Sequence, residues 1–282
     1  FATLAAFASL LCAPVLLAGA APAPAPSRTL ADRAGPAHPI NPVDAALKPL
    51  AMAPATPMTN AQRLKRGLAP NRPKFPRSSP RKLAPRASST PQPGCTPRYG
   101  ALNVVGAGVP PAAFVARVPN EFGEYGVTAD FADALVVLYL ACPGSAAALP
   151  VDLVTQNGLA DYTYFGGITG FANTSPDLEP GSANYAYLGG ILSSTGASAP
   201  PQDAPNSFTY ATGDAEDVES TIWSVSPVDG AVSARWVNTD GAPAPATQAV
   251  YFPAQNFLLL TADPAAVEAE YGPSDVVALT FV

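Results

Sequence analysis

The apolar residues that follow Cys95 come in short runs of four to seven, separated by Gly, Pro, Asn and Asp. Runs of this length, rich in β-branched and aromatic residues, are typical of β-strands rather than helices. Strands at this spacing, with little helix between them, predict an all-β domain over residues 95–282, an antiparallel β-sandwich or barrel. The predicted strands are 101–105, 113–118, 134–140, 151–155, 185–192, 220–225, 231–237, 247–252, 257–261 and 276–282.

One short helix is predicted close to the end of the chain. Asp263 is placed to cap its first turn, and Pro264 occupies that turn. Val267 and Tyr271 fall on one face of the helix, and Gly272 ends it. The predicted fold class is therefore all-β with one short C-terminal helix.

A repeated pattern links two segments of this domain. Residues 161–168 and 184–191 both carry a Tyr-x-Tyr-x-Gly-Gly-Ile pattern. Alternating side chains followed by two glycines are typical of a strand that ends in a bulge or sharp bend. We expect the two copies to be paired, equivalent strands of one sheet, and a duplicated half-domain is the alternative.

The segment 226–230 predicts a β-hairpin, because Pro227 presets a turn and Gly230 accepts a left-handed conformation. A two-residue loop places Trp223 directly opposite Trp236, whereas a four-residue loop makes the two indoles diagonal neighbours. Both registers put the pair on the apolar face of the hairpin. Stacked indoles can form a sugar-binding platform, but the apolar neighbours of this pair favour a place in the core.

Charge divides the chain into two parts. Of the 15 Lys and Arg, 12 precede residue 95, with 2 of the 21 Asp and Glu and the single His, so the net charge is +10 there and −16 in residues 95–282. The domain thus has no Lys and no His. This excludes Ser-His-Asp and Cys-His catalysis, His-ligated zinc, a Walker loop and a lysine Schiff base. The negative charge opposes nucleic-acid binding, and no cofactor or metal is predicted.

Residues 1–20 have the features of a secretory signal peptide. They are almost wholly apolar, and Ala18-Gly19-Ala20 fits the small-x-small pattern that signal peptidase cleaves. The positive n-region of such peptides is absent, which indicates a truncated start. A membrane anchor is the alternative. It is disfavoured because the apolar core is interrupted by Pro14 and is shorter than the roughly 20 residues that a membrane span needs. No later segment predicts a stable membrane span, so we expect a secreted, extracellular or cell-wall protein.

Cysteine usage agrees with export. Cys12 would be lost with the signal peptide, which leaves Cys95 and Cys142 to form the predicted disulfide. A bridge that closes a loop of this size stabilises a protein by about 4 kcal/mol in the chain-entropy model. Two free thiols are the alternative, because two cysteines are too few to hold a metal.

Residues 21–94 have the composition of a disordered, Pro-rich, basic propeptide or stalk. The first 94 residues hold 17 of the 34 prolines, and the cations repel one another. The dibasic pair Lys65-Arg66 and the basic site at Arg86 are targets for a processing protease of the kexin kind. A permanent linker that binds acidic wall or membrane surfaces is the alternative. A further hypothesis is that this leader lies across the acidic domain until it is cut.

The densest polar cluster comprises Asp214, Glu216, Asp217 and Glu219. Carboxylates at short spacing could coordinate a hard cation such as Ca²⁺, although the EF-hand pattern is absent. Two of them could act as acid and base on a glycosidic bond, a hydrolysis that needs neither His nor Lys. A solvated acidic turn is the third interpretation and is typical of such runs.

Asn173-Thr-Ser175 forms a sequon, which makes Asn173 the predicted site of N-glycosylation. Pro176, which follows the sequon directly, disfavours occupancy. Sequons also arise by chance.

Five further segments of the chain carry a likeness to known proteins, and they are residues 59–67, 121–126, 181–190, 219–223 and 236–241. On these segments the chain resembles a family of small secreted proteins from basidiomycete fungi. The likeness spans most of the chain, but no motif in it is tied to a mechanism. It implies export and a single β-rich domain behind a Pro-rich basic leader, and it implies no activity, cofactor or catalytic residue.

Taken together, these features predict a secreted, disulfide-bonded acidic β-domain that acts at or near a fungal cell wall. The leading hypothesis is a non-catalytic binding module with cell-wall polysaccharide, a carbohydrate, as its ligand. A glycoside hydrolase that works through carboxylates alone is the first alternative. A structural wall protein without a small-molecule ligand is the second.

Overall fold

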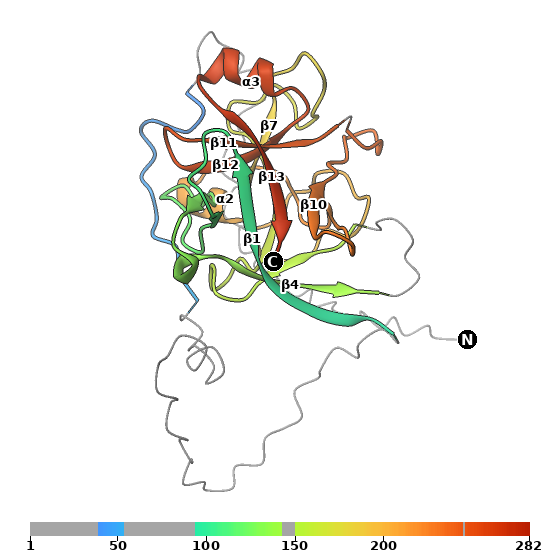
Figure 1. Ribbon diagram of the computed structural model, residues 1–282. Helices are drawn as coiled ribbons and strands as arrows, with labels where there is room; N and C mark the ends of the chain where they lie inside the picture. Colours follow the sequence, from blue (N-terminus) through green and yellow to red (C-terminus); the bar gives the residue numbers. More distant parts are fainter. Residues whose placement is uncertain (1–38, 54–93, 143–149, 245) are drawn as a thin grey trace, which may run out of the picture.

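The computed structural model describes residues 39–53, 94–142, 150–244 and 246–282. These residues form a closed barrel of eight antiparallel strands with further strands attached to its wall (Figure 1). The predicted all-β fold class is confirmed, and of the two predicted forms the chain adopts the barrel. Helices within the described ranges are η2 (Phe131–Asp133), α2 (Ser207–Thr212) and α3 (Pro264–Tyr271). The strands are β1 (Thr96–Gly106), β2 (Ala113–Val115), β3 (Val127–Thr128), β4 (Val136–Ala141), β5 (Leu153–Thr155), β6 (Tyr164–Thr169), β7 (Tyr185–Ile191), β8 (Val218–Glu219), β9 (Trp223–Val225), β10 (Ala231–Ala234), β11 (Gln248–Phe252), β12 (Phe257–Thr261) and β13 (Asp275–Phe281).

The barrel strands follow the order β1-β4-β5-β6-β7-β12-β11-β13, and β13 pairs with β1 to close the ring. The length of β1 makes this closure possible, because residues 96–101 pair with β4 and residues 102–106 pair with β13. Cys95 and Cys142 flank the β1–β4 pairing and are joined by a disulfide, with Cα atoms 4.0 Å apart. The predicted bridge is thus confirmed. Closure removes the exposed strand edges that an open sheet would leave.

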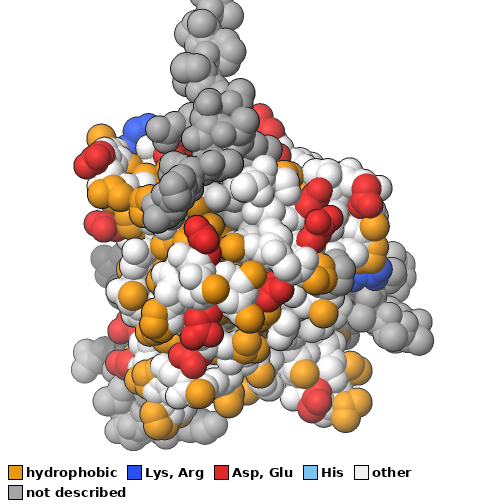
Figure 2. Space-filling model, turned by 90° about the horizontal axis from the view of Figure 1, so that it is seen from above, with side chains coloured by type: hydrophobic (Ala, Val, Ile, Leu, Met, Phe, Trp, Pro, Cys, Tyr) orange, Lys and Arg blue, Asp and Glu red, His pale blue; other side chains and the backbone are white. Residues whose placement is uncertain are grey.

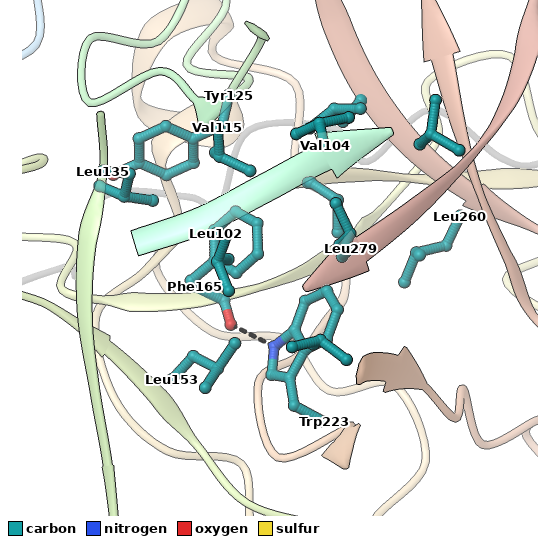
Figure 3. Close-up of a cluster of buried hydrophobic side chains, with 14 of the residues drawn as sticks. Leu102, Val104, Val115, Tyr125, Leu135, Leu153, Phe165, Trp223, Leu260 and Leu279 are labelled. Carbon is teal, nitrogen blue, oxygen red and sulfur yellow. Dashed lines mark hydrogen bonds between the residues drawn. The ribbon is translucent and has the colours of Figure 1, made fainter. Parts of the chain in front are cut away.

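Two neighbouring wall strands, β7 and β12, are buried on both faces, which explains why their sequences are apolar without polar alternation. On β7, Ala186 and Leu188 belong to the cluster inside the barrel, whereas Tyr185 and Tyr187 belong to a second cluster on the opposite face. Leu102, Phe165, Leu260 and Leu279 point toward one another in the inner cluster (Figure 3). The barrel therefore has an apolar interior and a second apolar layer outside part of its wall.

The two repeated segments form β6 and β7, which pair antiparallel as predicted. Their glycines do not lie at strand ends, however: Gly166 pairs with Gly189 in the middle of both strands. A Cβ atom on Gly167 would lie 2.5 Å from Cζ3 of Trp236. The glycines thus allow neighbouring groups to approach the wall closely. The prediction that these strands end in a bulge or sharp bend is replaced by close packing in the middle of the strands.

We expect Gly167→Ala to lower the free energy of unfolding by about 1–3 kcal/mol, because the added methyl overlaps the indole of Trp236. Urea unfolding monitored by circular dichroism measures the loss. In a double-mutant cycle, Trp236→Phe should recover part of it, since a smaller ring makes room for the methyl group. Strict additivity of the two losses would contradict this explanation.

The predicted hairpin joins β9 and β10 through a four-residue loop. Val225 pairs with Val232 and Trp223 with Ala234, which is the register of the four-residue loop, and Trp236 lies two positions beyond the end of β10. Gly230 adopts φ +74°, the left-handed conformation expected of it. The longer of the two predicted loops is therefore the one formed.

Residues 39–53, here called the strap, pack along the outside of the barrel and are blue in Figure 1. The Ala160 N–H donates to the Ala51 carbonyl at 2.9 Å, and the Ala53 N–H donates to the Gly158 carbonyl at 2.8 Å. At the other end of the strap, the Ile40 side chain is only 5% exposed. The predicted disordered segment 21–94 therefore needs correction, because residues 39–53 belong to the folded structure.

The remainder of that segment, with the processing residues Lys65, Arg66 and Arg86, lies outside the described residues. The same holds for the signal peptide at residues 1–20. Cleavage of the leader stays a prediction.

Candidate functional site

Trp223 and Trp236 are both fully buried. The Trp223 indole stacks on Phe165 with ring centroids 5.1 Å apart, and its Nε1–H donates to the Phe165 carbonyl at 2.7 Å (Figure 3). Trp236 Nε1–H donates to the Pro176 carbonyl at 3.0 Å. Both polar tips are thus satisfied inside the protein, as large buried aromatics require. The pair belongs to the core, and the alternative of a sugar platform is excluded for the folded chain.

The acidic cluster does not present its carboxylates on one surface. Glu216 and Glu219 are buried, whereas Asp214 and Asp217 are half-buried. Both carboxylate oxygens of Glu219 accept from the Val237 N–H, at 3.2 and 3.0 Å, and burial raises the Glu219 pKa to about 9. Burial also raises the pKa of Asp217, with a smaller contribution from the charge of Asp203. Alternating burial separates the four acids that the sequence places side by side.

Asn173 is fully buried, contrary to the requirements of a glycosylation site. Its Nδ2 donates to the Tyr185 carbonyl at 2.7 Å, and its Oδ1 accepts from the Tyr185 N–H at 3.0 Å. The side-chain amide of Asn173 thus makes the two hydrogen bonds to Tyr185 of β7 that the backbone of a neighbouring strand would otherwise make. Because a glycan needs this nitrogen at the surface, the folded chain cannot carry one at Asn173. The predicted glycosylation site is corrected accordingly.

A buried polar network that the sequence analysis did not assign lies beneath the strap. The carbonyl oxygen of Ile40 accepts a hydrogen bond from Tyr185 Oη at 2.7 Å and another from Tyr187 Oη. Backbone N–H groups of Phe171 and Ala172 donate to Tyr187 Oη and Tyr185 Oη, at 3.3 and 3.4 Å. Burial, reinforced by neighbouring tyrosines, raises the pKa of both hydroxyls well above the ordinary value. Both therefore keep their protons and act as donors.

Glu124 is the acid of this network and is fully buried. Asn120 Nδ2 donates to its Oε2 at 2.6 Å, and Asn41 Nδ2 from the strap donates to the same oxygen at 3.2 Å. Burial raises the Glu124 pKa to about 8 against the opposing effect of these two hydrogen bonds. Its Oε1 has no hydrogen-bond partner. A protonated carboxyl is the form that suits this site, since an unpaired buried carboxylate is costly.

A surface hollow of about 420 Å³ opens beside the buried network. The strap contributes five of its eight lining residues, and Phe171, whose N–H binds Tyr187 Oη, belongs to both sites. Asp214 of the predicted acidic cluster lies in this hollow together with Asp44 of the strap. The full lining is Pro39, Pro42, Val43, Asp44, Ala45, Phe171, Thr212 and Asp214. Two carboxylates, one hydroxyl and the apolar side chains of the strap thus border this space.

Acidic side chains are also spread over the face of the molecule seen in Figure 2, among hydrophobic ones and few Lys or Arg. Across the described ranges, no group of three or more His, Cys, Asp or Glu is arranged to hold a metal ion. The four acids at 214–219 therefore do not form such a group. The hollow differs from a flat acidic surface in its shape and in the residues that the strap contributes.

One signal for the strap was present in the sequence. Within residues 39–53 the only cation is Lys48, and Ile40, Leu50 and Met52 recur among the prolines. Leu50 and Met52 pack against the interior cluster of the barrel. Glu124 gave no comparable signal, because a single carboxylate in a loop is ordinarily solvated.

No protein-family model matches the chain, and neither a curated protein nor a solved structure matches it. The resemblance to secreted proteins of basidiomycete fungi therefore stays a prediction. Among the helices that the structure describes, none has the length and apolar character needed to cross a membrane.

Proposed function

We propose that the chain is a secreted, non-catalytic binding module of the extracellular space or cell wall, and that its ligand is a carbohydrate bound in the hollow. The observation that carries this proposal is the lining of the hollow. Asp44, Asp214 and Thr212 offer acceptors for sugar hydroxyls, and the exposed side chain of Val43 offers an apolar surface for sugar C–H groups. The volume of about 420 Å³ falls within the roughly 300–1,000 Å³ of small-molecule sites.

The distribution of pKa values favours binding over hydrolysis. A glycosidase needs one carboxyl group with a raised pKa at the scissile bond, facing a second, ionised one. The three acids with raised pKa values, Glu124, Asp217 and Glu219, do not line the hollow. Sugar binding needs no such acid, because ionised carboxylates accept hydrogen bonds from hydroxyl groups.

Asp214→Asn should weaken polysaccharide binding about tenfold, since the variant loses one charge-assisted hydrogen bond worth about 1.5–3 kcal/mol. A glycan array identifies the ligand, and calorimetry with that glycan measures the loss. Glu268→Gln removes an equal charge from the exposed face of α3 and should leave binding unchanged. An array without signal above background would contradict the proposed ligand class, and equal losses in both variants would contradict the proposed site.

Processing of the leader is part of the same proposal. Residues 54–93 hold nine Lys and Arg and no Asp or Glu, and they include Lys65-Arg66 and Arg86. A kexin-type protease would separate this basic segment from the acidic barrel. Intact-mass analysis of exported protein should show cleavage within residues 54–93, and an uncut N-terminus at Ala21 would contradict it.

A further inference from the structure

The strap contacts the barrel as a bound peptide contacts its receptor. It makes backbone hydrogen bonds from Ala51 and Ala53 to the barrel, and Lys48 N–H donates to the Ala211 carbonyl at 2.9 Å. Hydrogen bonds from the main chain and pockets for selected side chains are the two elements of peptide recognition by folded domains. Both elements are present along residues 39–53.

The apolar anchor at the N-terminal end is Ile40. Its side chain is part of the outer apolar cluster, which also contains Phe208 of α2 and Phe257 of β12. At the C-terminal end, Leu50 and Met52 pack against the interior cluster. Val43 between these anchors is 76% exposed. The strap is therefore held at two separated points, as a bivalent ligand is.

Polar groups next to Ile40 provide the specificity. Two tyrosine hydroxyls donate to the Ile40 carbonyl, and Asn41 Nδ2 donates to Gln255 Oε1 at 2.9 Å as well as to Glu124. All of these groups are buried or partly buried, so loss of the strap would break these hydrogen bonds and require the groups on the barrel to be solvated again. That cost opposes release of the strap.

We propose that the barrel surface that contacts residues 39–53 is a peptide-binding site whose ligand is the strap itself, and that the strap stays bound as a separate chain after the leader is cut. Hydrolysis of one peptide bond within residues 54–93 adds one water and creates a carboxylate and an amine. The only further agent is the endoprotease. The mature protein is then a two-chain complex of strap and barrel.

This inference rests on the proposed function in one respect, because it takes the cut within residues 54–93 from there. It also adds a condition to the proposed ligand binding. Five of the eight residues that line the hollow belong to the strap. A processed protein that lost the strap would lose most of the hollow. Retention of the strap therefore decides whether the mature form keeps this site.

Limited trypsin digestion of the full chain tests the proposal without any ligand. Lys48 is followed by Pro49, and trypsin does not cut a Lys-Pro bond. Cleavage after Arg33 and Arg63 therefore produces residues 34–63 as one fragment. We expect this fragment to co-elute with the barrel in native size-exclusion chromatography, with both masses in one peak. A fragment that elutes separately, whether or not the barrel keeps its circular dichroism spectrum, overturns the proposal.

Paired variants identify the contacts that hold the strap. In the cut protein, Ile40→Ala should release fragment 34–63 at least about tenfold faster than the parent does, because a buried anchor is truncated. Val43→Ala shortens an exposed side chain of the same segment and should leave the release rate unchanged. Equal release rates for the two variants would overturn the assigned binding surface. Because these readouts are masses and rates, they stand independently of any result on carbohydrate binding.

Discussion

Trp223→Ala should lower the free energy of unfolding by about 4 kcal/mol. The indole is fully buried between strands of the barrel and stacks on Phe165. Truncation removes this contact, leaves a cavity in a closed interior, and deprives the Phe165 carbonyl of its 2.7 Å donor. Urea unfolding monitored by tryptophan fluorescence and circular dichroism measures the loss.

Two further variants separate the causes of this loss. Trp223→Phe keeps an aromatic ring but removes the N–H donor, so it should cost only about 1–2 kcal/mol. Val228 lies in the hairpin loop, and its side chain is 92% exposed. Val228→Ala should therefore change the free energy of unfolding by less than about 0.5 kcal/mol. A loss for Trp223→Ala no larger than that of Val228→Ala would contradict the placement of the indole in the core.

Glu124→Gln should raise the free energy of unfolding by about 3 kcal/mol at neutral pH. The pKa of Glu124 is about 8 in the folded protein against an ordinary value of 4.5, because burial disfavours the charged form. Folding at neutral pH therefore requires this carboxyl to take up a proton, at a cost of about 1.4 kcal/mol per pH unit above its ordinary pKa. Glutamine is neutral at every pH and avoids this cost.

The pH dependence gives the sign of the effect. Between its two pKa values, Glu124 binds more protons in the folded state than in the unfolded state, so its contribution to stability falls as pH rises from 4.5 to about 8. Glu219, with a pKa raised to about 9, acts in the same direction. The difference in free energy of unfolding between Glu124→Gln and the parent should therefore be near zero at pH 4.5 and grow as the pH rises to about 8.

Denaturant unfolding across this pH range measures the difference. Glu268→Gln, on the exposed face of α3, should keep the profile of the parent, because its carboxyl contacts water in both states. A Glu124→Gln profile that runs parallel to the parent throughout would show that burial does not hold this carboxyl neutral.

The sequence alone predicted the elements whose determinants are local. The hairpin at 226–230 follows from Pro227 and Gly230, and α3 begins at Pro264 behind its Asp263 cap as predicted. The pairing of the two Tyr-x-Tyr segments and the disulfide also agree with the structure. Each of these follows from backbone preferences, strand periodicity or the chemistry of two cysteines, which neighbouring residues are sufficient to define.

The environment of individual polar side chains was not predictable in this way. Asp214 and Glu219 stand five positions apart, but the first borders a hollow and the second is buried against Val237. Asn173 carries a complete sequon, although its amide is a buried partner of Tyr185. Burial depends on which distant strands pack above a residue, so a motif cannot reveal it.

The strap shows this division most clearly. Residues 39–53 have a composition typical of disordered chains, and their local sequence favours no regular structure. Tyr185 Oη and the Ile40 carbonyl are 145 positions apart in the chain, and their hydrogen bond exists only because the closed barrel presents both tyrosines on its outer face. The sequence by itself determined most of the longer strands, the hairpin and the disulfide, because short-range preferences specify them. The tertiary structure alone decided the docking of the strap, the neutral state of Glu124 and the formation of the hollow, because each depends on burial by residues remote in the chain.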